Sequence, residues 1–213
     1  GLVLPLDFIP LAEETGVILP LGRGVLEQAC AQVAAWRREV PGAPDLVLSV
    51  NVSPRQFRHP RFPDDVRRVL DDTGLPASAL KLEITENAGL DNGDETAGIM
   101  RRLKALGVGI AIDDFGTGYT ALSYLRHYPI DTLKLDRLFT GGVDSAEDMA
   151  IVRAVIAFAN SLDLTVIAEG IETAEQADRL RSLGCPLAQG FHFARPLPAE
   201  DAERFLRAST VAA

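Results

Sequence analysis

Short apolar runs recur along this chain, and each one ends in a polar side chain before a helical segment begins. The residues at the ends of these runs are Asn51, Glu83, Asp113, Lys134, Glu169 and Gln189. Their spacings lie between 20 and 35 residues, and each spacing fits one strand followed by one helix. Because the runs are apolar along their whole length, they predict a parallel sheet with helices on its faces.

Two architectures are compatible with this pattern. Polar residues at six strand ends favour a TIM-like (βα) barrel, whose site collects side chains from several strands. The alternative is an open doubly wound sheet, which concentrates its site at one switch point, and the sequence has no GxGxxG fingerprint. We therefore predict an α/β fold with one barrel domain over residues 1–213.

The expected elements follow from the same pattern. Strands begin at Leu46, Leu80 and Leu164, one covers Val108–Ile112, and short ones lie in IDTLKLD and before Gln189. Prolines 5, 10 and 20 are expected to break up the short apolar pieces at the start of the chain, before the first helix. Helices are expected over residues 23–38, 63–73, 94–106, 145–162, 175–183 and 199–207. The helix near residues 149–158 has more apolar positions than one core-facing stripe needs, so it is a candidate partner surface.

Composition excludes several classes of protein. A net charge of -9 argues against broad binding of DNA, which needs a basic surface. No apolar run approaches the roughly 20 residues of a membrane span, and no secretory signal opens the chain, so we expect a cytoplasmic protein. Cys30 and Cys185 lack metal-ligand spacing and are expected to be buried free thiols. A local basic cluster at residues 55–61 is interpreted as a solvated loop.

The adjacent aspartates Asp113 and Asp114 carry the main chemical signal. Two neighbouring carboxylates repel each other and lose hydration when buried, so they need a cation nearby. An Asp that caps a strand-to-helix turn is the alternative for either residue alone. Asn51, Glu83 and Glu169 would complete an all-oxygen ligand set, which suits Mg²⁺, Mn²⁺ or Ca²⁺ rather than zinc.

Such a set could hold two metal ions that activate a water for attack at phosphorus. Asp113 is our choice for the carboxylate shared by both ions, and Glu169 could bind the second ion. Lys134 would stabilise negative charge that develops during the reaction, and Gln189 could orient the water. Each of these residues also has a structural interpretation as a strand-end or loop contact.

Three further residues are expected to support the site without binding the metal ions themselves. Glu86, Thr117 and Glu172 lie just beyond the strand ends, where we expect them to hold the loop that follows Asp114.

Motifs that cover most of the chain resemble, in order, those of the EAL domain family: NVSPRQF, LEITE, DDFGTGYTALSYL, LKLD, AEGIET and QGFHFARP. The resemblance implies a TIM-like barrel that hydrolyses cyclic di-GMP to linear pGpG with two Mg²⁺ or Mn²⁺ ions. Ca²⁺ is expected to support binding without turnover and so to inhibit. By motif, the residues that match metal ligands are Asn51, Glu83 and Asp113. The residues on the side of the second metal ion are matched by Asp114 and Glu169. Lys134 and Gln189 match the residues around the attacking water, and Glu86 matches the acid that steadies the loop 115–122.

The motif that names the family, with its metal-ligand Glu, is expected upstream of residue 1. We therefore expect a trimmed chain that lacks the first barrel strand, together with a further regulatory domain and a homodimer in the full protein. The runner-up function is a cyclic di-GMP receptor or a protein-interaction module without catalysis. A different metal-dependent chemistry, such as enolisation with Lys134 as the base, is a third hypothesis.

Overall fold

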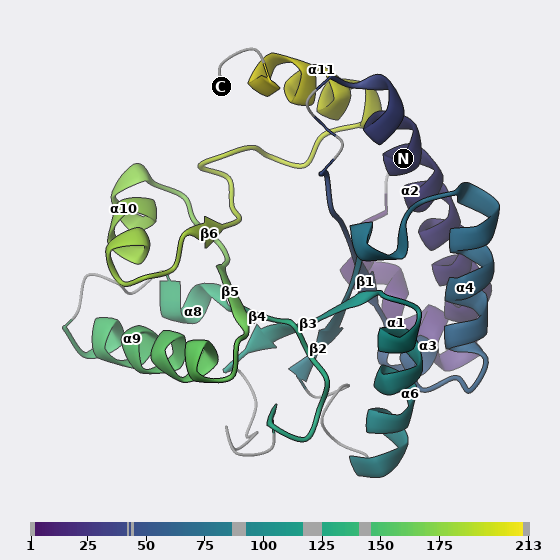
Figure 1. Cartoon of the computed structure of the whole chain (residues 1–213), viewed down its shortest axis with the longest axis horizontal. Helices are drawn as coiled ribbons and strands as arrows, with labels where there is room; N and C mark the ends of the chain where they lie inside the picture. Colours follow the sequence, from purple (N-terminus) through teal and green to yellow (C-terminus); the bar gives the residue numbers. More distant parts are fainter. Residues whose placement is uncertain are drawn as a thin grey trace.

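The structure is a computed structural model that describes residues 3–41, 43, 45–86, 93–116, 125–140 and 146–210. Six parallel strands form one sheet in chain order, and the sheet curls into a half-barrel (Figure 1). The strands are β1 (Leu48–Val52), β2 (Leu80–Thr85), β3 (Gly109–Phe115), β4 (Thr132–Leu135), β5 (Thr165–Ala168) and β6 (Leu187–Ala188). The predicted α/β, TIM-like fold class is confirmed.

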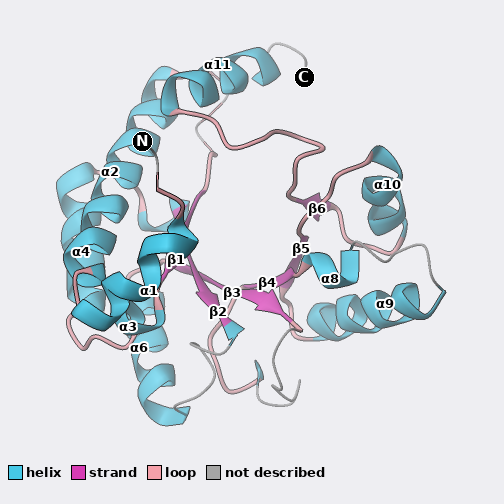
Figure 2. Cartoon of the chain, turned by 180° about the vertical axis from the view of Figure 1, so that it is seen from behind, coloured by secondary structure: helices cyan, strands magenta, loops and turns pink. Residues whose placement is uncertain are grey.

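Helices cover the outer face of the curled sheet (Figures 1 and 2). Beside β1–β3 lie α1 (Pro5–Thr15), α2 (Ile18–Glu39), α3 (Pro54–Phe57), α4 (Phe62–Thr73) and α6 (Gly93–Ala105). Beside β4–β6 lie α8 (Arg137–Thr140), α9 (Ala146–Ser161) and α10 (Ala174–Ser182). A 3₁₀ turn, η1 (Ala77–Ala79), precedes β2, and α11 (Ala199–Thr210) follows β6 after a long connection.

Alternation along each strand separates the core from the site. Leu82 and Ile84 on β2 and Leu133 and Leu135 on β4 have no exposed surface and pack under the helices. Because successive side chains on a strand point to opposite faces, the residues between them point into the half-barrel. In β2 and β4 these positions hold the polar side chains that form the candidate site.

The first helices differ from the prediction. Prolines 5, 10 and 20 do not break the segment, which forms α1 and α2 on either side of Gly16. Pro5 and Pro20 lie in first helical turns, where a backbone N–H has no intrahelical acceptor to lose. Gly16 ends α1 in the left-handed conformation, with φ of 81°.

Strand β3 is longer than predicted. We expected Asp113 and Asp114 beyond the strand end, but β3 extends to Phe115, which pairs with Leu135. The register shifts between Ile112 and Phe115, and Asp114 has a φ of 53°. These are the marks of a β-bulge, which lets the strand continue past the two aspartates.

The last helix closes onto the first part of the chain. Trp36 on α2 donates a hydrogen bond from Nε1 to Glu203 Oε2 on α11 over 3.3 Å, and Figure 1 shows α11 beside α2. Both cysteines are buried and free, as predicted. No helix in the described ranges is long and apolar enough to cross a bilayer.

The carboxylate of Asp131, just before β4, contacts both β3 and α6, so substituting it tests how much these contacts stabilise the fold. Its carboxylate accepts hydrogen bonds from Ile110 N (2.8 Å) and from Lys104 Nζ (2.7 and 2.8 Å). We expect Asp131→Ala to lower the free energy of unfolding by about 1–3 kcal/mol, because a backbone N–H in the sheet loses its partner. Urea unfolding followed by circular dichroism measures this change.

The matched control is Asp178→Ala, whose carboxylate is exposed and contacts Arg181 on the same helix. We expect it to change stability by less than about 0.5 kcal/mol. Equal effects of the two substitutions would contradict the role assigned to Asp131.

Candidate active site

Lys134 lies at the centre of the polar cluster inside the half-barrel. It comes from β4 and is 2% exposed. Its Nζ lies 2.6 Å from Glu83 Oε2, 2.9 Å from Asp113 Oδ1 and 2.7 Å from Glu169 Oε1. Four strands or strand ends therefore meet at one ammonium group.

The charge of the cluster is not balanced by Lys134 alone. Burial raises the pKa of Glu169 to about 7; Lys134 opposes this rise and Asp113 adds to it. Burial, Asp113 and Asp136 likewise raise the pKa of Asp114. For Lys134, burial favours the neutral form, but hydrogen bonds to Glu169 and Glu83 outweigh it and hold the pKa above its usual range.

The bulge in β3 brings the two aspartates together. In a regular strand, Asp113 and Asp114 would point to opposite faces of the sheet. Here Asp113, Asp114 and Glu169 each offer a carboxylate oxygen, and these oxygens lie within 4.8 Å of one another. The bulge therefore converts two neighbouring residues of one strand into one binding site.

These carboxylates fit a divalent metal ion. Asp113 Oδ1 is buried, and the ammonium group of Lys134 lies 2.9 Å from it. Because this one ammonium group is shared with Glu83 and Glu169, a further cation would stabilise the carboxylates. All donors are carboxylate oxygens, which is the donor type that Mg²⁺, Mn²⁺ and Ca²⁺ prefer.

Glu83 and Asn51 lie side by side in the sheet. Asn51 of β1 pairs in register with Glu83 of β2, and Val50 and Val52 on either side of Asn51 are buried. Glu83 is 5% exposed and is held by Lys134, whereas Asn51 is exposed at the edge strand. The register thus puts both predicted ligands on the same face as Lys134.

A hollow of about 260 Å³ opens beside this cluster. It is lined by Glu169, Glu172 and Gln189, and also by Asp136, Arg137 and Phe191, which we did not predict as site residues. Asp136 follows Lys134 by two residues at the end of the same strand, so its position was a usable sequence signal. No spacing marked Arg137 or Phe191.

Gln189 is positioned by a close approach of two chain segments. Its N–H donates to Ala168 O (2.8 Å), and its carbonyl accepts from Ile171 N (3.1 Å). A Cβ at Gly190 would lie 2.1 Å from Ile171 O, so this contact requires glycine. The side chain of Gln189 is thereby held at the wall of the hollow.

The supporting residues have different surroundings. Glu86 is 2% exposed and accepts a hydrogen bond from Gly116 N over 2.9 Å, so it holds the turn after β3. Glu172 is exposed, and its backbone N–H donates to Gln176 Oε1. Thr117 lies outside the described residues, as does most of the loop 115–122, so the role of these residues stays a prediction.

Comparison with known proteins identifies relatives of this chain. The EAL domain family matches residues 1–196. A bifunctional diguanylate cyclase/cyclic di-GMP phosphodiesterase of Pseudomonas aeruginosa, MucR, is 44% identical over 94% of this chain and 29% of its own length. The cyclic di-GMP phosphodiesterase NbdA of the same organism is 44% identical over 98% of this chain and 26% of its own length. The chain therefore spans less than a third of these relatives.

Solved structures agree with the sequence match. The P. aeruginosa MucR phosphodiesterase in complex with c-di-GMP superposes with a TM-score of 0.89 at 43% identity, covering 95% of this chain and 81% of that one. The EAL enzyme Bd1971, bound to cAMP and cyclic di-GMP, gives 0.91 at 33% identity, covering 97% and 56%. With the family match extending over nearly the whole chain, this chain belongs to the EAL domain family.

Proposed function

We propose that this chain is a metal-dependent phosphodiesterase domain that hydrolyses cyclic di-GMP to linear pGpG. The observation that carries the proposal is the buried cluster in which one ammonium group faces three carboxylates, with a fourth, Asp114, beside them. Its surplus negative charge calls for cations, and a phosphodiester substrate is itself an anion that needs them. The EAL relatives named as cyclic di-GMP phosphodiesterases support the choice of substrate.

The residues that would hold the metal ions are Asn51, Glu83, Asp113, Asp114 and Glu169. When bound, Mg²⁺ or Mn²⁺ ions lower the pKa of water and polarise a phosphoryl oxygen. Asp113 is suited to a shared position because one of its carboxylate oxygens lies within 4.8 Å of those of Asp114 and Glu169. We expect Ca²⁺ to bind and to inhibit.

Lys134 has two tasks in this proposal. Its contacts at 2.6–2.9 Å fix Glu83, Asp113 and Glu169 in one geometry before substrate arrives. Its charge also lies where negative charge develops on the phosphoryl group, and because the site is buried that charge acts strongly. Gln189, fixed at the wall of the hollow, would orient the attacking water through its side-chain amide.

A second candidate function is a receptor for cyclic di-GMP, or a protein-interaction module, without hydrolysis. It is favoured by EAL relatives whose structures were solved with cyclic di-GMP bound, since binding of the nucleotide does not by itself require its hydrolysis. The homodimer and the further regulatory domain expected above also stay proposals.

Glu169→Gln tests the catalytic proposal. The amide still accepts a hydrogen bond from Lys134 but removes one negative charge from the metal site, so we expect hydrolysis to fall by roughly 10²-fold or more. Production of pGpG from cyclic di-GMP with Mg²⁺ or Mn²⁺, resolved by chromatography, measures the rate. Addition of EDTA to the wild-type chain should abolish it.

Glu200→Gln on α11 is the matched control, because the same chemical change occurs on an exposed helix. It should leave hydrolysis unchanged. Saturable binding of cyclic di-GMP in Ca²⁺, without hydrolysis in Mg²⁺ or Mn²⁺, would favour the receptor function over the phosphodiesterase. Undiminished hydrolysis by Glu169→Gln would refute the assignment of Glu169.

The raised pKa of Glu169 gives a second prediction, on stability without metal. The folded state holds this proton up to a pH of about 7, above the usual range of a glutamate. Its contribution to stability is therefore present at low pH and is lost as pH rises through 7. In EDTA, the free energy of unfolding of wild type should fall relative to that of Glu169→Gln as pH rises from 4.5, the usual pKa of a glutamate, to about 7. Urea unfolding at each pH measures the difference.

Mg²⁺ should reduce this pH-dependent difference, because a bound cation stabilises the ionised carboxylate. A difference that does not vary with pH in EDTA would mean that the pKa of Glu169 is the same in the folded and unfolded chain, which would contradict this prediction.

A further inference from the structure

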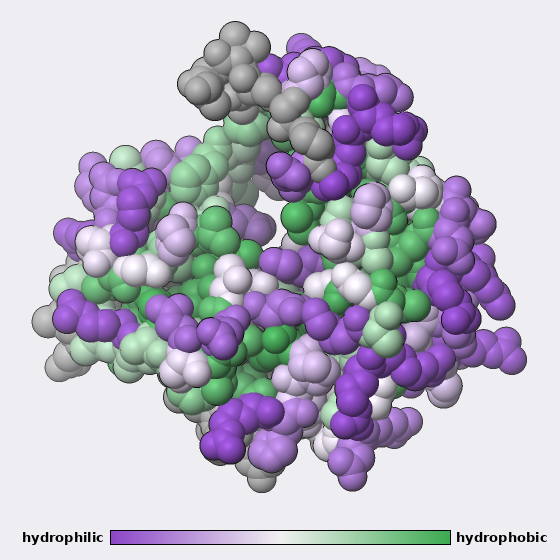
Figure 3. All heavy atoms as spheres, viewed as in Figure 1, coloured by the Kyte–Doolittle hydropathy of each residue, from purple (hydrophilic) through white to green (hydrophobic). Residues whose placement is uncertain are grey.

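The short helix α8 lies between two strand ends that carry carboxylates of the candidate active site. It begins just after β4 and contacts α9 (Figure 1). In Figure 3, hydrophobic side chains show among hydrophilic ones around α8 and α9, whereas the flank of α4 is largely hydrophilic. Asp136 holds the start of α8, because its carboxylate accepts a hydrogen bond from Leu138 N (2.8 Å) and its carbonyl accepts one from Phe139 N (3.0 Å). The strand that carries Lys134 therefore fixes where α8 begins.

Phe139 of α8 packs on the turn after β3. A Cβ added at Gly116 would lie 2.2 Å from Phe139 Cε2 and 2.5 Å from its Cζ, so the edge of the ring occupies the place of a side chain at this glycine. Gly116 has a φ of 98°, a conformation that favours glycine. Its N–H donates to Glu86 Oε2 over 2.9 Å. The turn is thus held by a hydrogen bond to Glu86 and by the ring of Phe139.

Arg137, at the start of α8, lies against the residue that follows Glu169. A Cβ added at Gly170 would lie 2.6 Å from Arg137 Cβ and 3.4 Å from Arg137 Cα, so the backbone of the helix itself approaches this glycine. Gly170 has a φ of 66°, so glycine is favoured at both places where α8 touches a strand end. α8 is therefore packed between the turn after β3 and the residues that follow β5.

These two contacts bear on the carboxylates because each glycine lies close to them in the chain. Gly116 follows Asp114 by two residues, and Gly170 follows Glu169 directly. Oxygens of Asp113, Asp114 and Glu169 lie within 4.8 Å of one another, so a small shift of either strand end changes their spacing. Asp114 also has a φ of 53°, which a residue with a side chain keeps only where its surroundings hold it. The carboxylate site thus depends on support from outside the strands.

We propose that Phe139 is a positioning residue of the metal site, and that α8 sets the separation between the two aspartates of β3 and Glu169. Phe139 touches neither metal ion nor substrate and acts through the turn at Gly116. Its ring is half-buried and packs against the hydrophobic core, so it connects the fixed core to this turn. The inference rests on the metal site of the proposed function, and its tests separate the two.

Mn²⁺ binding without nucleotide tests the role of Phe139. Phe139→Ala leaves the turn held by Glu86 alone, so we expect Mn²⁺ to bind roughly 10-fold more weakly, as is usual when the support of a metal ligand is lost. The EPR signal of free Mn²⁺ measures this affinity. Phe139→Leu keeps part of the apolar contact and should restore most of the affinity. The control is Leu138→Ala on the same helix, whose side chain is 71% exposed and should not affect Mn²⁺ binding.

A double-mutant cycle separates this contact from a general loss of stability. Gly116→Ala adds a methyl group that meets the ring of Phe139 and also strains the backbone, whereas in the Phe139→Ala chain only the backbone strain remains. We therefore expect Gly116→Ala to weaken Mn²⁺ binding by a factor at least about threefold smaller in the Phe139→Ala chain than in wild type. Circular dichroism checks that each variant is folded. Equal losses in the two chains, or unchanged Mn²⁺ binding by folded Phe139→Ala, would overturn the proposal.

Hydrogen exchange of the Gly116 amide, followed by NMR without metal, does not depend on the proposed function. Because Phe139 holds the turn in which this N–H donates to Glu86, Phe139→Ala should speed its exchange by roughly 10-fold, and Leu138→Ala should not. Unchanged exchange in Phe139→Ala would overturn the role of Phe139. Wild type that binds no Mn²⁺ would contradict the proposed metal site, and the exchange rates alone would then decide whether Phe139 positions the turn.

Discussion

The structure depends on one buried interaction, the contact of the Lys134 ammonium with Glu83, Asp113 and Glu169. These residues come from β2, β3, β4 and the end of β5, so the network joins the middle of the sheet across its inner face. Burying such charges is costly unless each one is paired. Lys134 contacts three carboxylates but does not neutralise all of them, and burial together with Asp113 keeps the pKa of Glu169 raised. The same imbalance that costs stability without metal prepares the site to bind cations.

The half-barrel provides the geometry for this interaction. Parallel strands bring their carboxyl ends to one edge, and the helices outside bury the apolar half of each strand. The bulge at Asp114 then adds a feature that regular strands cannot provide, because it directs two consecutive carboxylates to one side. Fold and chemistry are thus linked at a single irregular position in β3, which Glu86 supports by accepting the Gly116 N–H.

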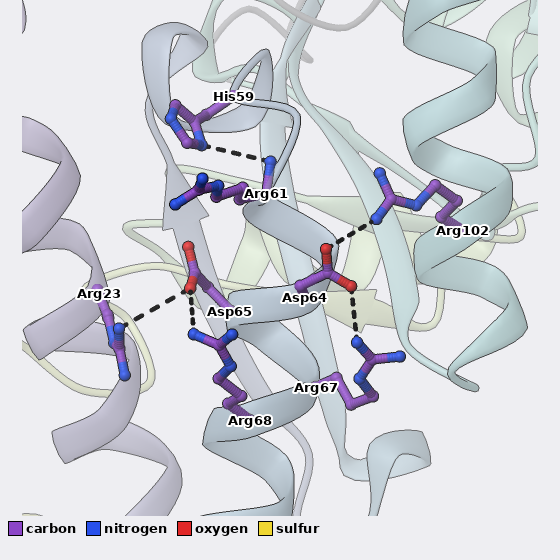
Figure 4. Close-up of polar contacts among 8 residues, drawn as sticks. All are labelled: Arg23, His59, Arg61, Asp64, Asp65, Arg67, Arg68 and Arg102. Carbon is purple, nitrogen blue, oxygen red and sulfur yellow. Dashed lines mark hydrogen bonds and ion pairs between the residues drawn. The ribbon is translucent and has the colours of Figure 1, made fainter.

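Charge is arranged in opposite ways on the two faces of the sheet. Inside the half-barrel, three carboxylates contact the ammonium group of Lys134, and this surplus of negative charge suits metal ions. Outside, four arginines share Asp64 and Asp65, and these pairs tie α4 to α2 and α6 (Figure 4). The outer pairs are exposed and contribute little stability each.

The sequence by itself determined the strand order, the fold class and the family, because apolar runs, polar strand ends and ordered motifs are local features of the chain. It also placed most helices, whose ends follow from signals such as Gly74 and Gly107 at left-handed positions. It was wrong about the prolines of α1 and α2, because Pro5 and Pro20 lie in first helical turns. It was also wrong about the end of β3, because the bulge at Asp114 lets the strand continue. Only the tertiary structure decided which charges meet. The contacts of Lys134 and the place of Asp136 beside Asp114 join residues far apart in the chain, and no local pattern encodes those distances.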